Sequence, residues 1–222
     1  MADEPLGKRE RRRLASRLAD DLRQVVANLG EREIPDADLR AAADLGDALR
    51  QRIDGPQRAR WYENDATALA DRDRAAYLDQ SPIQGRLNPI APPMRVEIVV
   101  GEDGKKRVVG HARLGSAYEG PPHGVHGGWV AAMLDELLGT AQGLAEQRQG
   151  VTATLKIRFR HVTPLDEELR FEGWVAEDRG RVIMVRGTCH AGDTLTADAE
   201  GLFVRVDFNE IQQRMRGRRD GA

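Results

Sequence analysis

The chain has 222 residues, of which 40% are hydrophobic and 32% charged, an ordinary balance for a globular protein with a substantial core. Its formal net charge of −2 at pH 7 gives no overall positive field toward nucleic acid or acidic membranes. The single cysteine, Cys189, cannot form an internal disulfide, which fits a reducing compartment. No stretch reaches the roughly 20 apolar residues of a membrane helix, and residues 1–13 lack the apolar core of a signal peptide. We therefore expect a cytoplasmic protein without membrane insertion.

Residues 1–80 are expected to form a helical N-terminal extension. Apolar residues recur at helical spacing from Leu14 to Leu29, and Gly30 is a suitable helix stop. A second amphipathic run lies between Pro35 and Gly55, and a third, shorter one covers residues 66–78. The apolar stripe of the first helix predicts that the extension packs on the rest of the chain or assists oligomerisation.

A basic run at residues 8–13 raises the question of nucleic-acid binding. Residues 1–80 nevertheless contain 15 basic and 17 acidic residues, so the region is not basic as a whole. Non-specific binding to DNA depends on Lys and Arg neutralising phosphates. We therefore interpret the run as a solvated helix face and expect no nucleic-acid partner.

The composition changes at residues 81–93, a proline-rich connector that cannot continue a helix. From residue 94 to residue 208 the pattern predicts two strands, one helix and four further strands, and residues 209–222 form a polar C-terminal tail. The strands are separated by turns rich in glycine and aspartate. They are expected at residues 94–100, 106–114, 151–161, 168–178, 181–190 and 195–207.

The predicted helix from Gly127 to Leu144 is apolar on nearly every side, which is typical of a buried helix enclosed by a curved sheet. It carries two adjacent carboxylates, Asp135 and Glu136. An unpaired buried carboxylate is costly, so at least one should have a partner or a chemical role. Because successive helical residues point about 100° apart, the two need not share an environment. We expect Glu136 to face solvent or to cap a neighbouring element.

The helix is preceded by His126, Gly127 and Gly128. Glycines permit close approach of a ligand to the backbone, and free N–H groups at a helix start attract negative charge. Such donors suit a carbonyl that becomes an oxyanion during hydrolysis. By itself, however, the glycine pair is equally consistent with a tight turn into a packed helix.

Residues 118–128, read as Tyr-Glu-Gly-Pro-Pro-His-Gly-Val-His-Gly-Gly, and the following Asp135 resemble the signature of the PaaI-like branch of hotdog thioesterases. Residues 152–160 and Pro164 are also similar to that family, and the resemblance spans about residues 94–208. It implies an α+β fold, in which a curved antiparallel sheet wraps around a central helix, preceded here by the helical extension. It also implies a homodimer or dimer of dimers with active sites between subunits.

The resemblance further implies the activity, hydrolysis of an acyl-CoA-type thioester. By analogy Asp135 is the catalytic carboxylate, either as the general base for water or as the nucleophile. Gly127 or Gly128 offers a backbone N–H to the thioester carbonyl with help from His126, and Thr152 steadies the attacking water. No cofactor is implied, and the sequence has no Cys/His cluster of metal-site spacing.

Five further residues are candidates for binding the substrate. Trp129 and His123 flank the glycines and could wall an acyl pocket, although Trp129 also suits a core position. Glu119 stands where many family members have Asn, which removes an expected amide contact. Arg158 and Arg160 alternate on a predicted strand, where a solvated face and contact with CoA phosphates are both open.

Helix geometry gives an independent reason for a dimer. Gly127 and Asp135 are eight residues apart, roughly 12 Å along one helix axis, whereas reacting groups must come within about 3 Å of their targets. A two-fold partner with an antiparallel helix would place each helix start beside the middle of the other. Two other functions stay open: a non-enzymatic acyl-CoA sensor whose helical segment has a regulatory role, and a dehydratase of the same fold.

Overall fold

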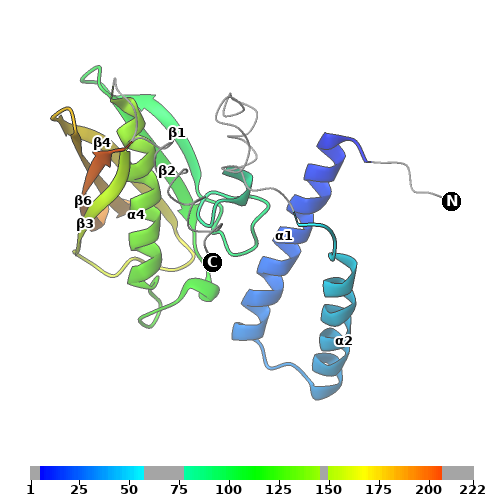
Figure 1. Ribbon diagram of the computed structural model, residues 1–222. Coiled ribbons are helices and arrows are strands. Elements are labelled where there is room, and N and C mark those ends of the chain that lie inside the picture. The colour runs from blue at the N-terminus through cyan, green and yellow to red at the C-terminus, as the bar shows by residue number, and fades with distance from the viewer. Residues whose placement is uncertain (1–5, 58–77, 146–149, 207–222) are drawn as a thin grey trace, which may run out of the picture.

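The computed structural model describes residues 6–57, 78–145 and 150–206 (Figure 1). The tail predicted at residues 209–222 lies outside this part of the chain, as does nearly all of the third helical run. Within the described residues, no helix is long and apolar enough to cross a membrane. The domain boundaries proposed from the composition remain predictions.

In the described part of the N-terminal extension, residues 6–57 contain two helices, as the apolar spacing predicted. Helix α1 runs from Lys8 to Glu31 and helix α2 from Asp36 to Arg52. Pro35 immediately precedes α2, where its missing N–H removes no helical hydrogen bond. The two helices lie antiparallel as a hairpin beside the rest of the molecule (Figure 1).

Six strands form one antiparallel sheet in the order β1-β2-β4-β5-β6-β3, so β1 and β3 are the edge strands. Glycines at left-handed φ angles form the hairpin turns at Gly104, Gly180 and Gly192, which confirms the predicted turns. The strands are β1 (Arg95–Val100), β2 (Lys106–Arg113), β3 (Gly150–Phe159), β4 (Glu168–Asp178), β5 (Val182–Ala191) and β6 (Thr194–Arg205).

Helix α4, from Gly127 to Ala141, packs across one face of the sheet and contacts five of its strands (Figure 1). Its buried side meets aliphatic and aromatic residues of the sheet, which confirms the expected hotdog arrangement of a sheet around a central helix. The buried helix residues are Val130, Met133, Leu134, Leu137, Leu138 and Ala141. The side of α4 away from the sheet is only partly covered by the described residues.

The α-helix ends earlier than the predicted Leu144, because residues 142–144 tighten into a 3₁₀ turn. Gln142 explains this end. Its side-chain amide donates to the carbonyl of Gly150 at 3.0 Å, and its side-chain oxygen accepts the Gly150 N–H at 2.7 Å. This buried, reciprocal pair joins the end of the helix to the start of β3.

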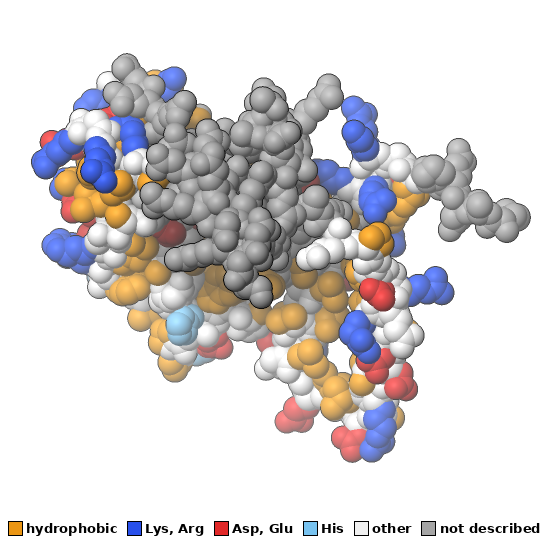
Figure 2. All heavy atoms as spheres, in the orientation of Figure 1, with side chains coloured by type: hydrophobic (Ala, Val, Ile, Leu, Met, Phe, Trp, Pro, Cys, Tyr) orange, Lys and Arg blue, Asp and Glu red, His pale blue; other side chains and the backbone are white. Residues whose placement is uncertain are grey.

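Helix α1 contacts the rest of the fold mainly through polar side chains. Arg12 makes a bidentate pair with Asp79, Glu31 accepts the hydroxyl of Ser116, and Ala19 is the single buried residue of the helix. Only the first half of the apolar stripe is sheltered: Leu14, Leu18 and Leu22 are partly buried, whereas Val25 and Leu29 remain more than half exposed. Hydrophobic side chains accordingly appear along the hairpin surface (Figure 2).

Candidate functional site

The carboxylate of Asp135 lies on the partly exposed side of α4 and faces the edge strand β3. Its Oδ1 accepts a hydrogen bond from the hydroxyl of Thr152 at 3.1 Å. Asp135 is half-buried, whereas Thr152 is exposed, so the pair lies at the surface of this single chain. The structure thus brings together two residues that the family resemblance had linked.

The start of α4 is capped by a histidine side chain. Nδ1 of His126 accepts the N–H of Gly128 at 3.0 Å. For a neutral imidazole this contact places the proton on Nε2, which becomes a donor. The N–H of Gly128 is therefore occupied, whereas the N–H of Gly127 has no hydrogen-bond partner among the described residues. The geometry thus distinguishes between the two glycines, which the sequence could not do.

The loop before the helix is closed by Glu119. Its Oε1 accepts the backbone N–H of His123 at 2.8 Å. His123 is exposed and has a φ angle of +60°, a left-handed conformation that is uncommon outside glycine. Glu119 therefore stabilises a turn that includes its own position and that of His123, which gives this departure from the family pattern a structural role.

Aromatic side chains surround the helix start. Trp129 and Tyr118, from the short 3₁₀ helix η2 (Ser116–Tyr118), meet edge to face with ring centroids 4.9 Å apart. Burial raises the pKa of the Tyr118 hydroxyl, against a smaller opposing effect of the Arg23 charge. On the other side, a side chain at Gly127 would press on the ring of Phe159, at 3.2 Å from a Cβ to Cζ. Phe159 itself is 57% exposed.

The two candidate arginines, Arg158 and Arg160, do not lie beside Asp135. Leu155 and Ile157 of β3 pack toward the core, and since alternate strand residues point to opposite faces, Arg158 faces away from α4. It lines a hollow of about 390 Å³ on the outer face of the sheet, together with Trp174. Arg160 pairs with Asp198 beside this hollow. The structure does not bring either arginine to Asp135, and their contact with CoA phosphates stays a prediction.

The remaining reactive residue types of the described chain are not gathered at one place. No group of three or more His, Cys, Asp or Glu residues there could hold a metal ion. His111 lies near Glu168, and Nδ1 of His161 contacts the carbonyl of Leu195. Cys189 is fully buried, and burial raises the pKa of its thiol to about 11, so it is a poor nucleophile.

Two polar residues beside the candidate site, Ser81 and Gln84, escaped the sequence analysis. Oε1 of Glu136 accepts hydrogen bonds from the Ser81 hydroxyl at 3.0 Å and from the Gln84 amide at 2.8 Å. The expectation that Glu136 contacts a neighbouring element is therefore correct, and that element is the connector. No local motif marks Ser81 or Gln84, because they are more than 50 residues from Glu136 in the chain.

Comparisons with known proteins give this geometry a context. The sequence model of the thioesterase superfamily matches residues 123–198. The chain is 31% identical over 98 residues to the acyl-coenzyme A thioesterase THEM5 of Homo sapiens, covering 43% of this chain and 39% of that protein. It is 30% identical over 112 residues to the acyl-coenzyme A thioesterase THEM4 of Bos taurus, covering 50% and 46%. The chain thus spans less than half the length of either relative.

A solved structure extends the similarity to nearly the whole chain. The crystal structure of a thioesterase superfamily protein superposes with a TM-score of 0.71 at 30% sequence identity. The match covers 86% of this chain and 90% of that one, so it includes more than the sheet and its central helix. The helix–sheet fold, the motif at the helix start and this whole-chain likeness agree: the chain belongs to the thioesterase superfamily.

Proposed function

We propose that the protein hydrolyses an acyl-CoA-type thioester to a free acid and a thiol. The observation that carries the proposal is the Asp135–Thr152 hydrogen bond on an accessible side of the central helix. It gives a carboxylate a neighbouring hydroxyl, the pair needed to hold and activate one water molecule. Both matched relatives are acyl-coenzyme A thioesterases, which supports a thioester as the substrate.

In the proposed reaction, Asp135 takes a proton from a water molecule held by the Thr152 hydroxyl. The water oxygen adds to the thioester carbon and forms a tetrahedral oxyanion. When the oxyanion collapses, the C–S bond breaks and the acid is released; the protonated Asp135 passes its proton to the leaving thiolate, which yields the thiol and restores the carboxylate. Direct attack by the carboxylate, through an anhydride that water then opens, is the alternative route, and it leads to the same products.

The helix start supplies donors for the oxyanion. The N–H of Gly127 is unoccupied among the described residues and lies at the positive end of the α4 dipole. His126 can add its Nε2–H, because its Nδ1 is already used by Gly128. We assign Gly127 as the backbone donor, with Gly128 allowing close approach and anchoring the His126 ring.

We further propose that the site is completed by a second copy of the chain. Gly127 and Asp135 belong to one continuous helix and remain roughly 12 Å apart along its axis. The exposed side of α4 can accept another helix, since a Cβ at Gly139 would meet nothing within 4 Å. Strand β3 has a free edge whose backbone groups can pair with another strand. A homodimer, or a dimer of dimers, would bring one helix start to the other Asp135.

The acyl group would then enter beside the helix start. Trp129 and His123 are proposed to contact it, while Glu119 shapes the loop that carries His123. Arg158 and Arg160 are proposed to meet the phosphates of the CoA carrier where β3 ends. No nucleic-acid partner enters this proposal.

A panel of acyl-CoA thioesters tests the function directly. Release of free thiol should be measured against acyl chains of different length and against the same acyl groups on an acyl carrier protein. We expect turnover of at least one thioester well above the spontaneous rate. Binding of acyl-CoA without any thiol release would instead identify a sensor.

A further inference from the structure

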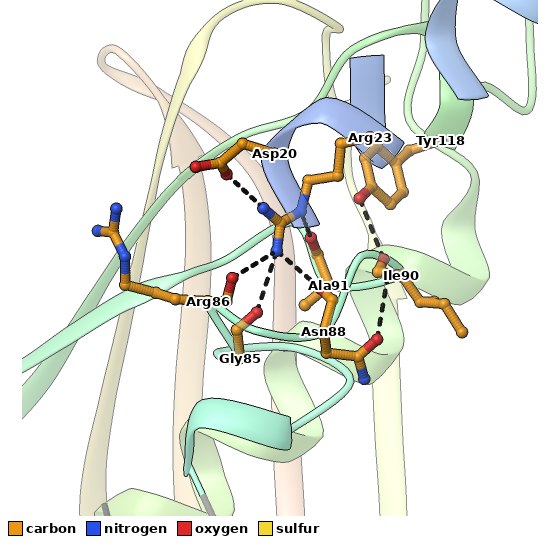
Figure 3. A network of polar contacts seen from close by, with 8 residues as sticks. All are labelled: Asp20, Arg23, Gly85, Arg86, Asn88, Ile90, Ala91 and Tyr118. Carbon is orange, nitrogen blue, oxygen red and sulfur yellow. Dashed lines mark hydrogen bonds and ion pairs between the residues drawn. The ribbon is translucent and has the colours of Figure 1, made fainter. Parts of the chain in front are cut away.

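The connector is a folded hub that meets both α1 and α4. Its residues Ile83 and Ala91 are buried, as is Met94 immediately after it. Four backbone carbonyls of this segment, at residues 85, 86, 88 and 91, converge on the guanidinium of Arg23 from α1 at 2.7–3.3 Å (Figure 3). Because the connector is held by these buried residues and by Arg23, it has a defined conformation and can position a helix that it contacts.

The hub binds the central helix through one carboxylate. The Ser81 hydroxyl oxygen accepts the N–H groups of Ile83 and Gln84, both at 3.1 Å. Because a hydroxyl has a single hydrogen, these two contacts leave its O–H to point at Glu136, which accepts it. Gln84 donates to the same Glu136 oxygen. The connector therefore presents two donors that are pre-oriented for an acceptor at position 136.

Glu136 is the neighbour of the proposed catalytic carboxylate. The two side chains leave the same helix about 100° apart, so a contact that holds Glu136 also restrains the stretch of backbone that carries Asp135. Packing on the sheet orients the buried face of α4, but on its partly exposed side Gly128 and Gly139 provide no side chain that could pack. The contacts of Asp135 with Thr152 and of Glu136 with the hub join this part of the helix to β3 and to the connector.

We infer that Glu136 is a positioning residue, through which the connector braces the partly exposed side of α4 and keeps Asp135 directed at Thr152. The inference rests on the proposed function, because it assigns a purpose to the orientation of Asp135. It also gives the N-terminal extension a role, since Arg23 of α1 holds the connector that holds Glu136. Misplacement of a reacting group by about 1 Å can lower a rate about 100-fold.

Two substitutions at one position separate positioning from chemistry. Glu136→Ala removes the acceptor and should lower kcat about 10- to 100-fold with little change in KM. Glu136→Gln keeps a side-chain oxygen that can accept from Ser81 and Gln84, so it should retain most of the rate and the same pH profile. Asp38→Ala, which removes an exposed carboxylate from α2, is the matched control and should behave like the unaltered protein.

A double-mutant cycle tests the connection to the hub. Gln84→Ala should lower kcat less than Glu136→Ala does. When Glu136→Ala is already present, adding Gln84→Ala should cost nothing further, because the two residues act through one contact. Additive losses in kcat would contradict positioning through the hub.

Asp135→Asn in the same assay distinguishes the inference from the proposed function. Normal turnover by Asp135→Asn would refute the catalytic assignment itself. If Asp135→Asn is inactive, full activity of Glu136→Ala overturns the inference alone, and so does a Glu136→Gln protein as inactive as Glu136→Ala. Hydrogen exchange adds a readout without turnover: amides around residue 135 should exchange faster in Glu136→Ala than in Glu136→Gln. Equal exchange in both proteins would also overturn the inference.

Discussion

The α4–sheet core and the α1–α2 hairpin both carry regularly spaced apolar side chains, but they bury them to very different extents. Six residues of α4 are buried, whereas α1 has one buried residue and α2 has none. The core is therefore held mainly by removal of apolar surface from water, whereas the hairpin combines a few hydrogen bonds and ion pairs with partial burial of Leu14, Leu18 and Leu22. An apolar stripe in a sequence shows that a helix can pack, but it does not show where or how completely.

The proposed catalytic carboxylate belongs to the core, so the largest expected effect on activity is there. Asp135→Asn keeps the size of the side chain but removes the base, so thioester hydrolysis should fall about 10²- to 10⁴-fold. Circular dichroism should show an unchanged fold, because Asp135 is only half-buried. The measurement is thiol release under saturating substrate, and near-normal turnover would remove Asp135 from the proposed mechanism.

A matched pair of leucines tests the difference in burial. Leu134→Ala in α4 creates a cavity at a fully buried position and should lower the free energy of unfolding by about 2–5 kcal/mol. Leu45→Ala in α2, where the side chain is 71% exposed, should change it by no more than about 0.5 kcal/mol. Urea unfolding measures the free energy of unfolding of both variants. A comparable loss at Leu45 would show that another surface covers the hairpin.

An intermediate effect on the free energy of unfolding is expected where helix α1 of the hairpin contacts the connector. The Arg23 side chain is 16% exposed and donates to four connector carbonyls. Arg23→Ala leaves these acceptors to water or without partners, so the free energy of unfolding should fall by about 1–3 kcal/mol. Arg9→Ala, which changes an exposed arginine of the same helix, should have almost no effect. Equal stability of the two variants would show that the carbonyls are satisfied without Arg23.

Much of the core could be predicted from the sequence because its signals are local. Glycines marked the hairpin turns, and the apolar run after Gly128 marked the central helix. The pairing of Asp135 with Thr152 came from family resemblance, because helix and strand patterns alone do not place one against the other. The cap by His126 had a usable signal, since a side-chain acceptor just before a helix commonly binds the N–H two residues later.

The features that the sequence did not predict depend on distant contacts. Ser81 and Gln84 reach Glu136 only after the connector has folded against α4, and no periodicity reveals such a contact. The face of Arg158 depends on an irregularity of β3 between Thr152 and Thr154, which shifts the alternation of side chains by one residue. Strand alternation counted from Thr152 without this bulge puts Arg158 on the wrong face.

The smallest expected effect concerns Cys189, which should remain unmodified in the folded protein. It is fully buried, and burial raises its pKa to about 11. A raised thiol pKa favours the neutral form, so at pH 8 only about one molecule in a thousand would carry the reactive thiolate, and this fraction grows as the pH approaches 11. Labelling by iodoacetamide should therefore require opening of the core, and it should be negligible over hours at pH 8.

Labelling of Cys189 and hydrogen exchange of α2, measured on one sample, sharpen the comparison. A helix of 17 residues without buried side chains is marginally stable by itself in water, so its amides should exchange within seconds to minutes. The amides of α4 should remain protected as long as Cys189 is unlabelled, because both then report on opening of the same core. If α2 is instead protected as strongly as α4, its exposed leucines are covered in solution, and the hairpin must pack against a surface outside the described residues.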